Sequence, residues 1–137
     1  MAEETAPSTK SILIIDDDLT LREMYEDYMK ANGFTVLSAQ DGEEGLDKAK
    51  DSHPSAILLD LMMPKINGIE VLRRLKADNT MKDIPVIVFT ALIQDLEKQE
   101  SFAAGASDYV VKTDVTPKGI LDKINQFVDG KSPSEAA

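Results

Sequence analysis

Short apolar runs recur along the chain and predict five buried strands. The first of them is an unbroken apolar run, the kind expected of a strand that is covered on both faces. The runs are SILII at 11–15, FTVL at 34–37, AILLD at 56–60, PVIVF at 85–89 and DYVV at 108–111.

Amphipathic stretches between these runs predict five helices, because their apolar residues recur at the i, i+3, i+4, i+7 spacing. Four helices are expected at about 19–32, 42–50, 67–76 and 94–104, and the last begins near Pro117, a favourable first-turn residue. The inward face of the first helix is predicted to consist of Leu21, Met24, Tyr25, Tyr28 and Met29. In the fourth helix, Leu96 and Ala103 are expected to point inward.

Five strands that strictly alternate with five helices predict an α/β fold, in which helices cover both faces of a parallel sheet. A length of 137 residues suits a single domain. We place this domain at residues 11–129. Segments 1–10 and 130–137 are expected to be flexible, because they are small, polar and proline-bearing.

The charge balance argues against nucleic acids and membranes as direct partners. The chain carries 25 acidic and 15 basic residues, which gives a formal charge of −10. Such a surface repels phosphates and anionic lipids, so we expect neither direct nucleic-acid binding nor membrane insertion. There is no cysteine, which excludes disulfides and Cys-based zinc sites. With no secretory signal and no apolar run of roughly 20 residues, a cytoplasmic location is expected.

Polar residues of a reactive kind follow four of the five predicted strands. In open α/β sheets, sites form beyond the carboxyl ends of the strands, so these side chains are expected to meet at one rim. They are Asp16, Asp17 and Asp18 after the first strand, Asp60 after the third, Thr90 at the end of the fourth and Lys112 after the fifth.

Several of these residues also have a purely structural interpretation. Asp18 directly precedes a helix and is assigned as its N-cap. Three consecutive aspartates exceed what one helix needs, and Asp60 lies in ILLDLMMP, where Pro64 places a loop before the next helix. Thr90 or Lys112 alone would be an ordinary strand-end or solvated residue. Only the whole set points to chemistry.

The set contains what phosphoryl transfer needs. Clustered carboxylates offer the oxygen ligands that Mg²⁺ prefers. A carboxylate beside that cation is a competent nucleophile towards phosphorus. A lysine ammonium and a threonine hydroxyl would then neutralise and align the phosphoryl oxygens.

The chain resembles the receiver domain of two-component response regulators, in particular the single-domain, CheY-like members. The resemblance runs over nearly all of residues 11–128, through IIDDD, LLDLMMPKINGIEVL, VFTA and AGASDYVVK, in order and at compatible spacing. It implies a flavodoxin-like, doubly wound sheet with strand order 2-1-3-4-5.

The resemblance also implies a role for each site residue. Asp60 corresponds to the phosphoacceptor, and Asp16 and Asp17 correspond to the acidic pair that binds Mg²⁺, for which Mn²⁺ can substitute. The metal site would include Asp60 and the backbone carbonyl of Met62. Thr90 and Lys112 correspond to the hydroxyl and the lysine that hold the phosphoryl group.

The implied partners follow from the same family. The phosphoryl donor is a histidine kinase or a histidine phosphotransfer protein, and phosphorylation changes the face formed by helix four, strand five and helix five for a downstream target protein. Tyr109 corresponds to the aromatic switch residue that acts with Thr90; on its own it would be a half-buried strand residue whose hydroxyl reaches water. His53 matches no catalytic position and is expected to be a loop residue. Either a monomer or a weak dimer is compatible with the sequence.

One residue departs from the family pattern. A proline, usually in a cis peptide, follows the strand-five lysine in the family, whereas this chain has Thr113. A cis bond before a residue other than proline costs about 2.5–4 kcal/mol. The form of this turn, and with it the placement of Lys112, is therefore open at the level of sequence.

Three other functions compete with this interpretation. A receiver-like interaction module that no longer takes phosphate is kept open by Thr113. A Mg²⁺-dependent aspartyl phosphatase would want a second acid where Met62 stands. A flavin or nucleotide binder would need a phosphate-cradling loop where DDDLT carries three negative charges. No output domain follows the predicted core, so we expect a stand-alone regulator or a fragment of a longer chain.

Overall fold

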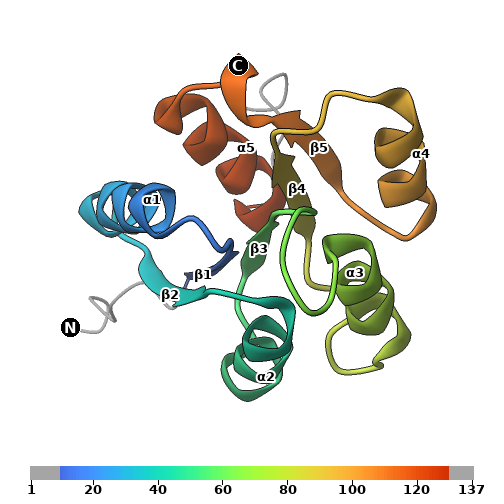
Figure 1. Ribbon diagram of the computed structural model, residues 1–137. Coiled ribbons are helices and arrows are strands. Elements are labelled where there is room, and N and C mark those ends of the chain that lie inside the picture. Colours follow the sequence, from blue (N-terminus) through green and yellow to red (C-terminus); the bar gives the residue numbers. More distant parts are fainter. Residues whose placement is uncertain (1–9, 130–137) are drawn as a thin grey trace.

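The computed structural model describes residues 10–129, which form five strands and five α-helices in strict alternation (Figure 1). Every predicted element is present, with ends that differ by a few residues. The elements are β1 (Ser11–Ile15), α1 (Leu19–Ala31), β2 (Thr35–Ala39), α2 (Gly42–Ser52), β3 (Ala56–Leu59), α3 (Gly68–Ala77), β4 (Val86–Thr90), α4 (Asp95–Ala103), β5 (Asp108–Val111), a 3₁₀ turn (Lys112–Asp114) and α5 (Pro117–Asp129).

The five strands form one parallel sheet in the order β2-β1-β3-β4-β5. This confirms the predicted flavodoxin-like order 2-1-3-4-5. The chain runs outward from β1 to β2 and then returns to β3 on the other side, so the direction of winding reverses between β1 and β3. Their carboxyl ends therefore flank the crevice in which such folds place their sites.

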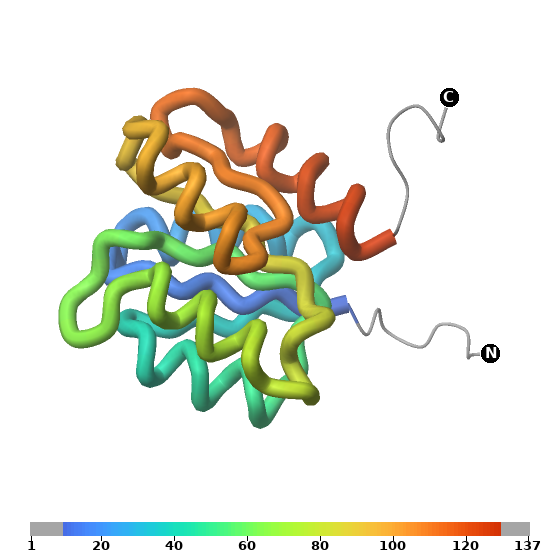
Figure 2. The backbone as a smooth tube through the Cα atoms, turned by 90° about the vertical axis from the view of Figure 1, so that its right-hand side faces the viewer, coloured from blue at the N-terminus to red at the C-terminus, as the bar shows by residue number. Residues whose placement is uncertain are grey.

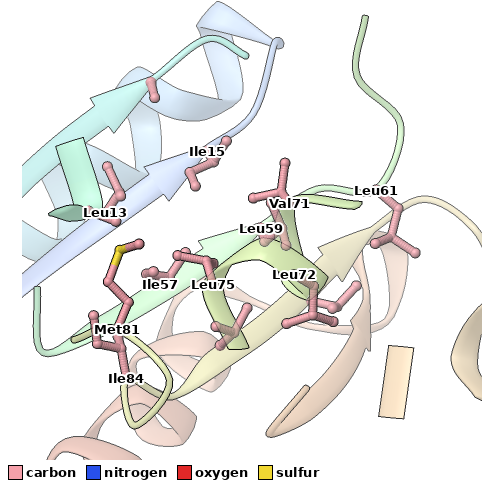
Figure 3. Close-up of a cluster of buried hydrophobic side chains, with 14 of the residues drawn as sticks. Leu13, Ile15, Ile57, Leu59, Leu61, Val71, Leu72, Leu75, Met81 and Ile84 are labelled. Atoms are coloured by element: carbon pink, nitrogen blue, oxygen red, sulfur yellow. The ribbon is translucent and has the colours of Figure 1, made fainter. Parts of the chain in front are cut away.

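Two apolar layers hold the helices against the sheet. On one face, alternate strand residues such as Leu13 and Leu59 pack against α2 and α3 (Figure 3). On the other face, residues such as Ile14 and Phe89 pack against α1 and α5. Burial on both faces explains why β1, β3 and β4 read as apolar runs.

Side-chain caps mark where three helices begin. Asp18, Asp41 and Asn67 each accept a hydrogen bond from the backbone N–H three residues later, at the starts of α1, α2 and α3. The capping role predicted for Asp18 is thus confirmed. Because the loops before α1 and α3 leave the carboxyl ends of β1 and β3, these caps also fix the rim of the site.

The inward faces of two helices differ from the prediction. Met24 of α1 is 46% exposed, whereas its neighbours Tyr25 and Met29 are buried. In α4, Leu96 is 60% exposed and Ala103 is also exposed, while Ser101 is buried. The helix α4 lies beside β5 at the edge of the sheet (Figure 1), so only a narrow strip of its surface meets the core and apolar spacing alone does not identify that strip.

Both ends of the described chain lie at the opposite end of the sheet from the site. Lys10 forms an ion pair with Asp129. The start of β1 and the last turn of α5 thus lie near each other (Figure 2). Apart from Lys10, the segments predicted to be flexible, 1–10 and 130–137, fall outside the described residues. His53 ends α2 in a left-handed conformation, and its ring nitrogen contacts the carbonyl oxygen of Thr80, also away from the site.

Candidate functional site

Two buried carboxylates lie side by side at the carboxyl end of the sheet. Asp16 and Asp60 follow directly on the paired residues Ile15 and Leu59, and they are only 2% and 5% exposed. Asp17 brings a third, exposed carboxylate. One oxygen from each of the three aspartates lies within 4.8 Å of the others. The structure thus brings together the three acids that the sequence placed at this rim.

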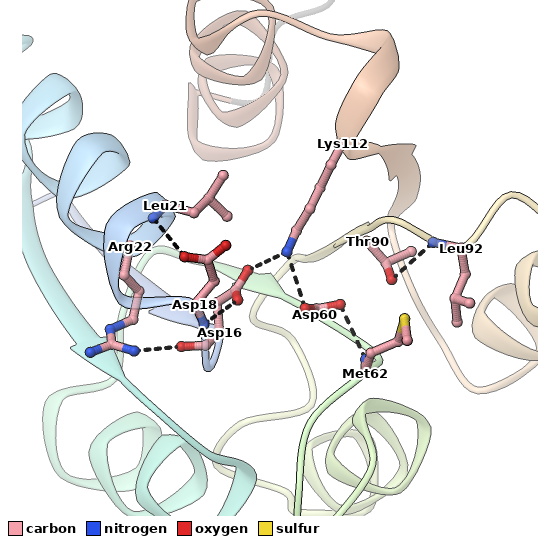
Figure 4. A network of polar contacts seen from close by, with 9 residues as sticks. All are labelled: Asp16, Asp18, Leu21, Arg22, Asp60, Met62, Thr90, Leu92 and Lys112. Atoms are coloured by element: carbon pink, nitrogen blue, oxygen red, sulfur yellow. Dashed lines mark hydrogen bonds and ion pairs between the residues drawn. The ribbon is translucent and has the colours of Figure 1, made fainter.

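The Asp60 carboxylate has a donor on each oxygen. Its Oδ1 accepts a hydrogen bond from the backbone N–H of Met62 at 3.1 Å, and its Oδ2 accepts one from Lys112 at 3.1 Å (Figure 4). Its own backbone N–H donates to the carbonyl oxygen of Ile15. Gly68 packs against the chain at this point, where an added Cβ would lie 2.4 Å from the Asp60 carbonyl oxygen.

Lys112 bridges the two buried acids. Its Nζ lies 2.8 Å from Asp16 Oδ2 and 3.1 Å from Asp60 Oδ2, and 5.9 Å from the centre of the Phe89 ring. Burial alone would lower the pKa of Lys112, but the hydrogen bonds and charges of Asp16 and Asp60 outweigh it and raise the pKa above its ordinary value. The ammonium is therefore fully charged at neutral pH and holds two like charges together.

The loop from β1 to α1 is a closed hydrogen-bonded unit around Asp16. Asp16 Oδ1 accepts a hydrogen bond from the Asp18 N–H at 2.9 Å, and its carbonyl oxygen accepts one from Arg22 Nη1 at 2.8 Å (Figure 4). Its own N–H donates to the carbonyl oxygen of Ala39. Burial raises the pKa of the Asp16 carboxyl, and the hydrogen bonds from Lys112 and Asp18 oppose that rise.

Thr90 and Tyr109 lie on the neighbouring strands β4 and β5. Thr90 is fully buried at the end of β4, and its Oγ1 accepts a weak hydrogen bond from the Leu92 N–H at 3.4 Å. Tyr109 of β5 is 9% exposed, and its hydroxyl donates to the Leu92 carbonyl oxygen at 2.8 Å. The ring therefore lies inward, and its hydroxyl bonds to the β4–α4 loop.

The turn at Thr113 keeps Lys112 in place without a cis peptide. No cis bond occurs among residues 10–129, and Lys112–Asp114 form a 3₁₀ turn. The Lys112 side chain nonetheless reaches both acids. The departure from the family pattern therefore leaves this lysine where the site needs it.

The donor set fits a hard divalent cation. The three converging groups offer only carboxylate oxygens, the ligands that Mg²⁺ prefers, and one of them is open to solvent, as suits an ion that keeps several waters. Met62 lies beside them and contacts Asp60 through its backbone, so its exposed apolar side chain does not conflict with a place at such a site.

Two residues of this region were not singled out from the sequence. Arg22 reaches back from α1 to the backbone of Asp16, and the available signal was a basic residue one turn after the Asp18 cap. Gly68, at the start of α3, has no side chain and so allows α3 to approach the backbone of Asp60 and Leu61. Both act through backbone contacts, which residue types alone do not reveal.

Comparison with known proteins identifies the family. A family model described as the response regulator receiver domain matches residues 12–125. Among curated proteins, the chain is 40% identical over 119 residues to the probable transcriptional regulator ycf27 of Porphyridium aerugineum, covering 87% of this chain and 48% of that protein. It is 37% identical over 124 residues to response regulator MprA of Mycobacterium sp. (strain KMS), covering 90% and 53%.

Solved structures agree. The chemotaxis protein CheY4 of Vibrio cholerae matches with a TM-score of 0.81 and 28% identity, covering 86% of this chain and 98% of that one. A CheY-like receiver domain protein from Methanospirillum hungatei JF-1 matches with a TM-score of 0.83 and 28% identity, covering 88% and 94%. The chain spans about half the length of the curated relatives named above. Within residues 10–129, no helix is both long and apolar enough to cross a membrane.

Proposed function

This chain belongs to the response regulator receiver family of two-component signalling, and on that basis we propose that Asp60 accepts a phosphoryl group and that the chain works as a phosphorylation-dependent switch. The observation that carries the proposal is the position of Asp60, buried at the carboxyl end of β3 between the Met62 N–H and the Lys112 ammonium. Burying a charged carboxylate costs free energy unless hydrogen-bond and charge partners compensate for it. A purely structural role therefore gives no reason for an aspartate at this position.

Asp60 acts as the nucleophile in the proposed step. A carboxylate oxygen of Asp60 forms a bond to phosphorus while the bond from phosphorus to the donor nitrogen breaks. The electron pair of that bond stays on the imidazole of the donor histidine, which is then protonated. The product is an acyl phosphate on Asp60 and a neutral histidine on the kinase or phosphotransfer protein.

Mg²⁺ held by Asp16, Asp17, Asp60 and the backbone carbonyl of Met62 would supply positive charge to the phosphoryl oxygens. The chain itself supplies the rest. Lys112 is already within hydrogen-bonding distance of Asp60, so its ammonium needs only a small shift to reach a phosphoryl oxygen. The Thr90 hydroxyl accepts only a long hydrogen bond from the Leu92 N–H, and its own O–H would donate to a phosphoryl oxygen.

We assign the output to the face formed by α4, β5 and α5. Movement of Thr90 would be transmitted through Leu92, which accepts hydrogen bonding from Tyr109, and so would bias the position of the Tyr109 ring. Tyr109 lines a hollow of about 330 Å³ on this face together with Ile93 and Lys123, which gives a target protein a surface that changes with the ring.

Members of this family are regulatory proteins rather than classical enzymes, and this one would catalyse only its own phosphorylation and dephosphorylation. We place it in the cytoplasm, where a histidine kinase or phosphotransfer protein can reach it.

The direct test is the intact mass of the protein after incubation with acetyl phosphate, with and without Mg²⁺. The wild type should gain one phosphoryl group only when Mg²⁺ is present, and Asp60→Asn should gain none. Thr90→Ala should still be labelled but should respond poorly in target binding. Equal labelling of Asp60→Asn would overturn the assignment, and a folded wild type that never gains mass would favour an interaction module without phosphate chemistry.

A further inference from the structure

Arg22 bonds to the peptide group that joins the two metal-binding acids. Its Nη1 donates to the carbonyl oxygen of Asp16 at 2.8 Å, in a partly buried setting. That carbonyl and the N–H of Asp17 belong to one planar peptide unit, so holding the oxygen also fixes the direction in which the chain enters Asp17. Asp17 is the one exposed acid of the cluster and lacks the enclosure that fixes Asp16.

Three further hydrogen bonds hold the loop between β1 and α1. The Asp18 N–H donates to Asp16 Oδ1, the Asp18 side chain caps α1 through the Leu21 N–H, and the Arg22 N–H donates to the Asp18 carbonyl oxygen. Arg22 thus donates two hydrogen bonds to the loop, one from its backbone N–H and one from its guanidinium. The loop position of Asp17 is set by the first turn of α1 rather than by Asp17 itself.

We infer that Arg22 is a positioning residue for the divalent-cation site, acting on Asp17 through the backbone of Asp16. The inference rests on the proposed function, since it takes the ion to be Mg²⁺ bound at these acids. Residues that orient metal ligands without touching the ion typically change affinity by about 10- to 100-fold when removed. Arginine suits the role because its charge is permanent and its planar fork holds a fixed donor direction.

The charge of Arg22 allows a sharp test, because two explanations of its role predict opposite changes in cation affinity when Arg22 is removed. If Arg22 were only a positive charge near the site, its removal would make the surroundings more negative and would strengthen cation binding. If Arg22 positions Asp17, its removal weakens cation binding despite the more negative surroundings. The sign of the change therefore separates the two roles.

The experiment compares Arg22→Met with two matched variants. Lys30→Met removes one positive charge from the same helix, where Lys30 pairs with Glu26 away from the loop. Arg22→Lys keeps the charge and a donor. Mg²⁺ affinity is measured by calorimetric titration, and exchange of the Asp17 and Asp18 amide hydrogens is measured by NMR in metal-free protein.

We expect Arg22→Met to lose about tenfold in Mg²⁺ affinity and to exchange these two amide hydrogens faster. Lys30→Met should match the wild type in both, and Arg22→Lys should recover most of the affinity. Unchanged or tighter Mg²⁺ binding in Arg22→Met, or unchanged amide exchange, would overturn the inference. A wild type that binds no Mg²⁺ would instead count against the proposed function, and the exchange rates in metal-free protein would still decide whether Arg22 holds the loop.

Discussion

The hydroxyl of Tyr109 donates a hydrogen bond of 2.8 Å to the carbonyl oxygen of Leu92. Leu92 also donates its N–H to Thr90, so one residue of the β4–α4 loop contacts both proposed switch residues. The Tyr109 hydroxyl of β5 and the Thr90 hydroxyl of β4 are thereby joined by two hydrogen bonds through the N–H and the carbonyl of one residue, Leu92. Such a linkage gives a shift of Thr90 a short physical route to Tyr109.

Tyr109→Phe should lower the free energy of unfolding by about 0.5–1.5 kcal/mol, because the ring stays packed while the Leu92 carbonyl loses its donor. Urea unfolding followed by circular dichroism measures the change. Tyr28→Phe serves as the control, since Tyr28 is only half-buried and lies on α1. Equal stability of Tyr109→Phe and the wild type would show that the bond contributes nothing. Phosphoryl labelling of Asp60 should persist in this variant, because the hydroxyl that is removed bonds to the Leu92 carbonyl oxygen and not to the Asp60 carboxylate.

Gly68→Ala should damage the site as well as the fold. An added Cβ would lie 2.4 Å from the carbonyl oxygen of Asp60 and 2.6 Å from Leu61 Cα, and backbone atoms cannot move aside as a side chain can. We expect a loss of about 1–3 kcal/mol in the free energy of unfolding together with slower labelling by acetyl phosphate.

Gly33→Ala provides the matched comparison for that variant. Gly33 has a positive φ of 95° and nothing within 4 Å of an added Cβ, so alanine there is strained by the backbone alone, far from the acids. It should lose stability but keep the wild-type labelling rate at a temperature where it is folded. If both variants label equally fast, the contact of Gly68 with the Asp60 backbone has no role in the chemistry.

Ser101→Ala should stabilise the protein, in contrast to most core substitutions. Ser101 is fully buried in α4, and its hydroxyl has no hydrogen-bond partner within residues 10–129. Removing an unpaired buried hydroxyl should raise the free energy of unfolding by about 1 kcal/mol. Ser107→Ala should have the opposite sign, because the Ser107 hydroxyl accepts a hydrogen bond from the Val86 N–H. Denaturant titration of the pair tests the contrast, and a destabilised Ser101→Ala would show that the hydroxyl has a partner in solution.

The sequence was sufficient for the fold and for the gathering of the strand-end polar residues at one rim, for a specific reason. Unbroken apolar runs report burial on both faces, and polar residues such as Asp60 and Lys112 stood at the ends of strands whose order the fold determines. It was insufficient for α4, where Leu96 was expected inward and Ser101 is inward instead. A helix that meets the core through one narrow strip leaves too little periodicity to orient it. Arg22 was missed because its partner is the backbone oxygen of Asp16, and a contact to the backbone cannot be read from residue types.

The cap of α2 should make part of the stability sensitive to acid. A hydrogen bond from the Glu44 N–H, helped by the Lys65 ammonium 3.3 Å away, holds the pKa of Asp41 below its ordinary value of 3.8. A carboxyl whose pKa is lower in the folded state stabilises the fold above its unfolded pKa, and this contribution is lost as the pH falls through the folded pKa. Asparagine still caps a helix but does not titrate.

Asp41→Asn should therefore lose less stability than the wild type on acidification. The measurement is the free energy of unfolding in urea at about pH 7 and about pH 3, on either side of the ordinary aspartate pKa. The difference between the two values should be smaller in Asp41→Asn. An equal difference in the two proteins would mean that Asp41 contributes nothing to the pH dependence.

Lys112→Met should separate cation binding from phosphoryl transfer. The Lys112 ammonium lies 2.8 Å from Asp16 and 3.1 Å from Asp60, so it occupies oxygens that a cation would also use. Its removal leaves two buried like charges without a counter-ion, which should raise Mg²⁺ affinity by about tenfold, the equivalent of one pKa unit of charge interaction.

The labelling rate of Lys112→Met should fall even when the protein is saturated with Mg²⁺, because the ammonium that would meet the phosphoryl oxygens is missing. Calorimetry and the time course of the mass shift give the two readouts on one preparation. Lys118→Met, which removes an exposed lysine paired with Asp122 on α5, controls for net charge. Weaker Mg²⁺ binding in Lys112→Met would show that the lysine organises the acids rather than competing for them. An unchanged rate would remove Lys112 from the proposed chemistry.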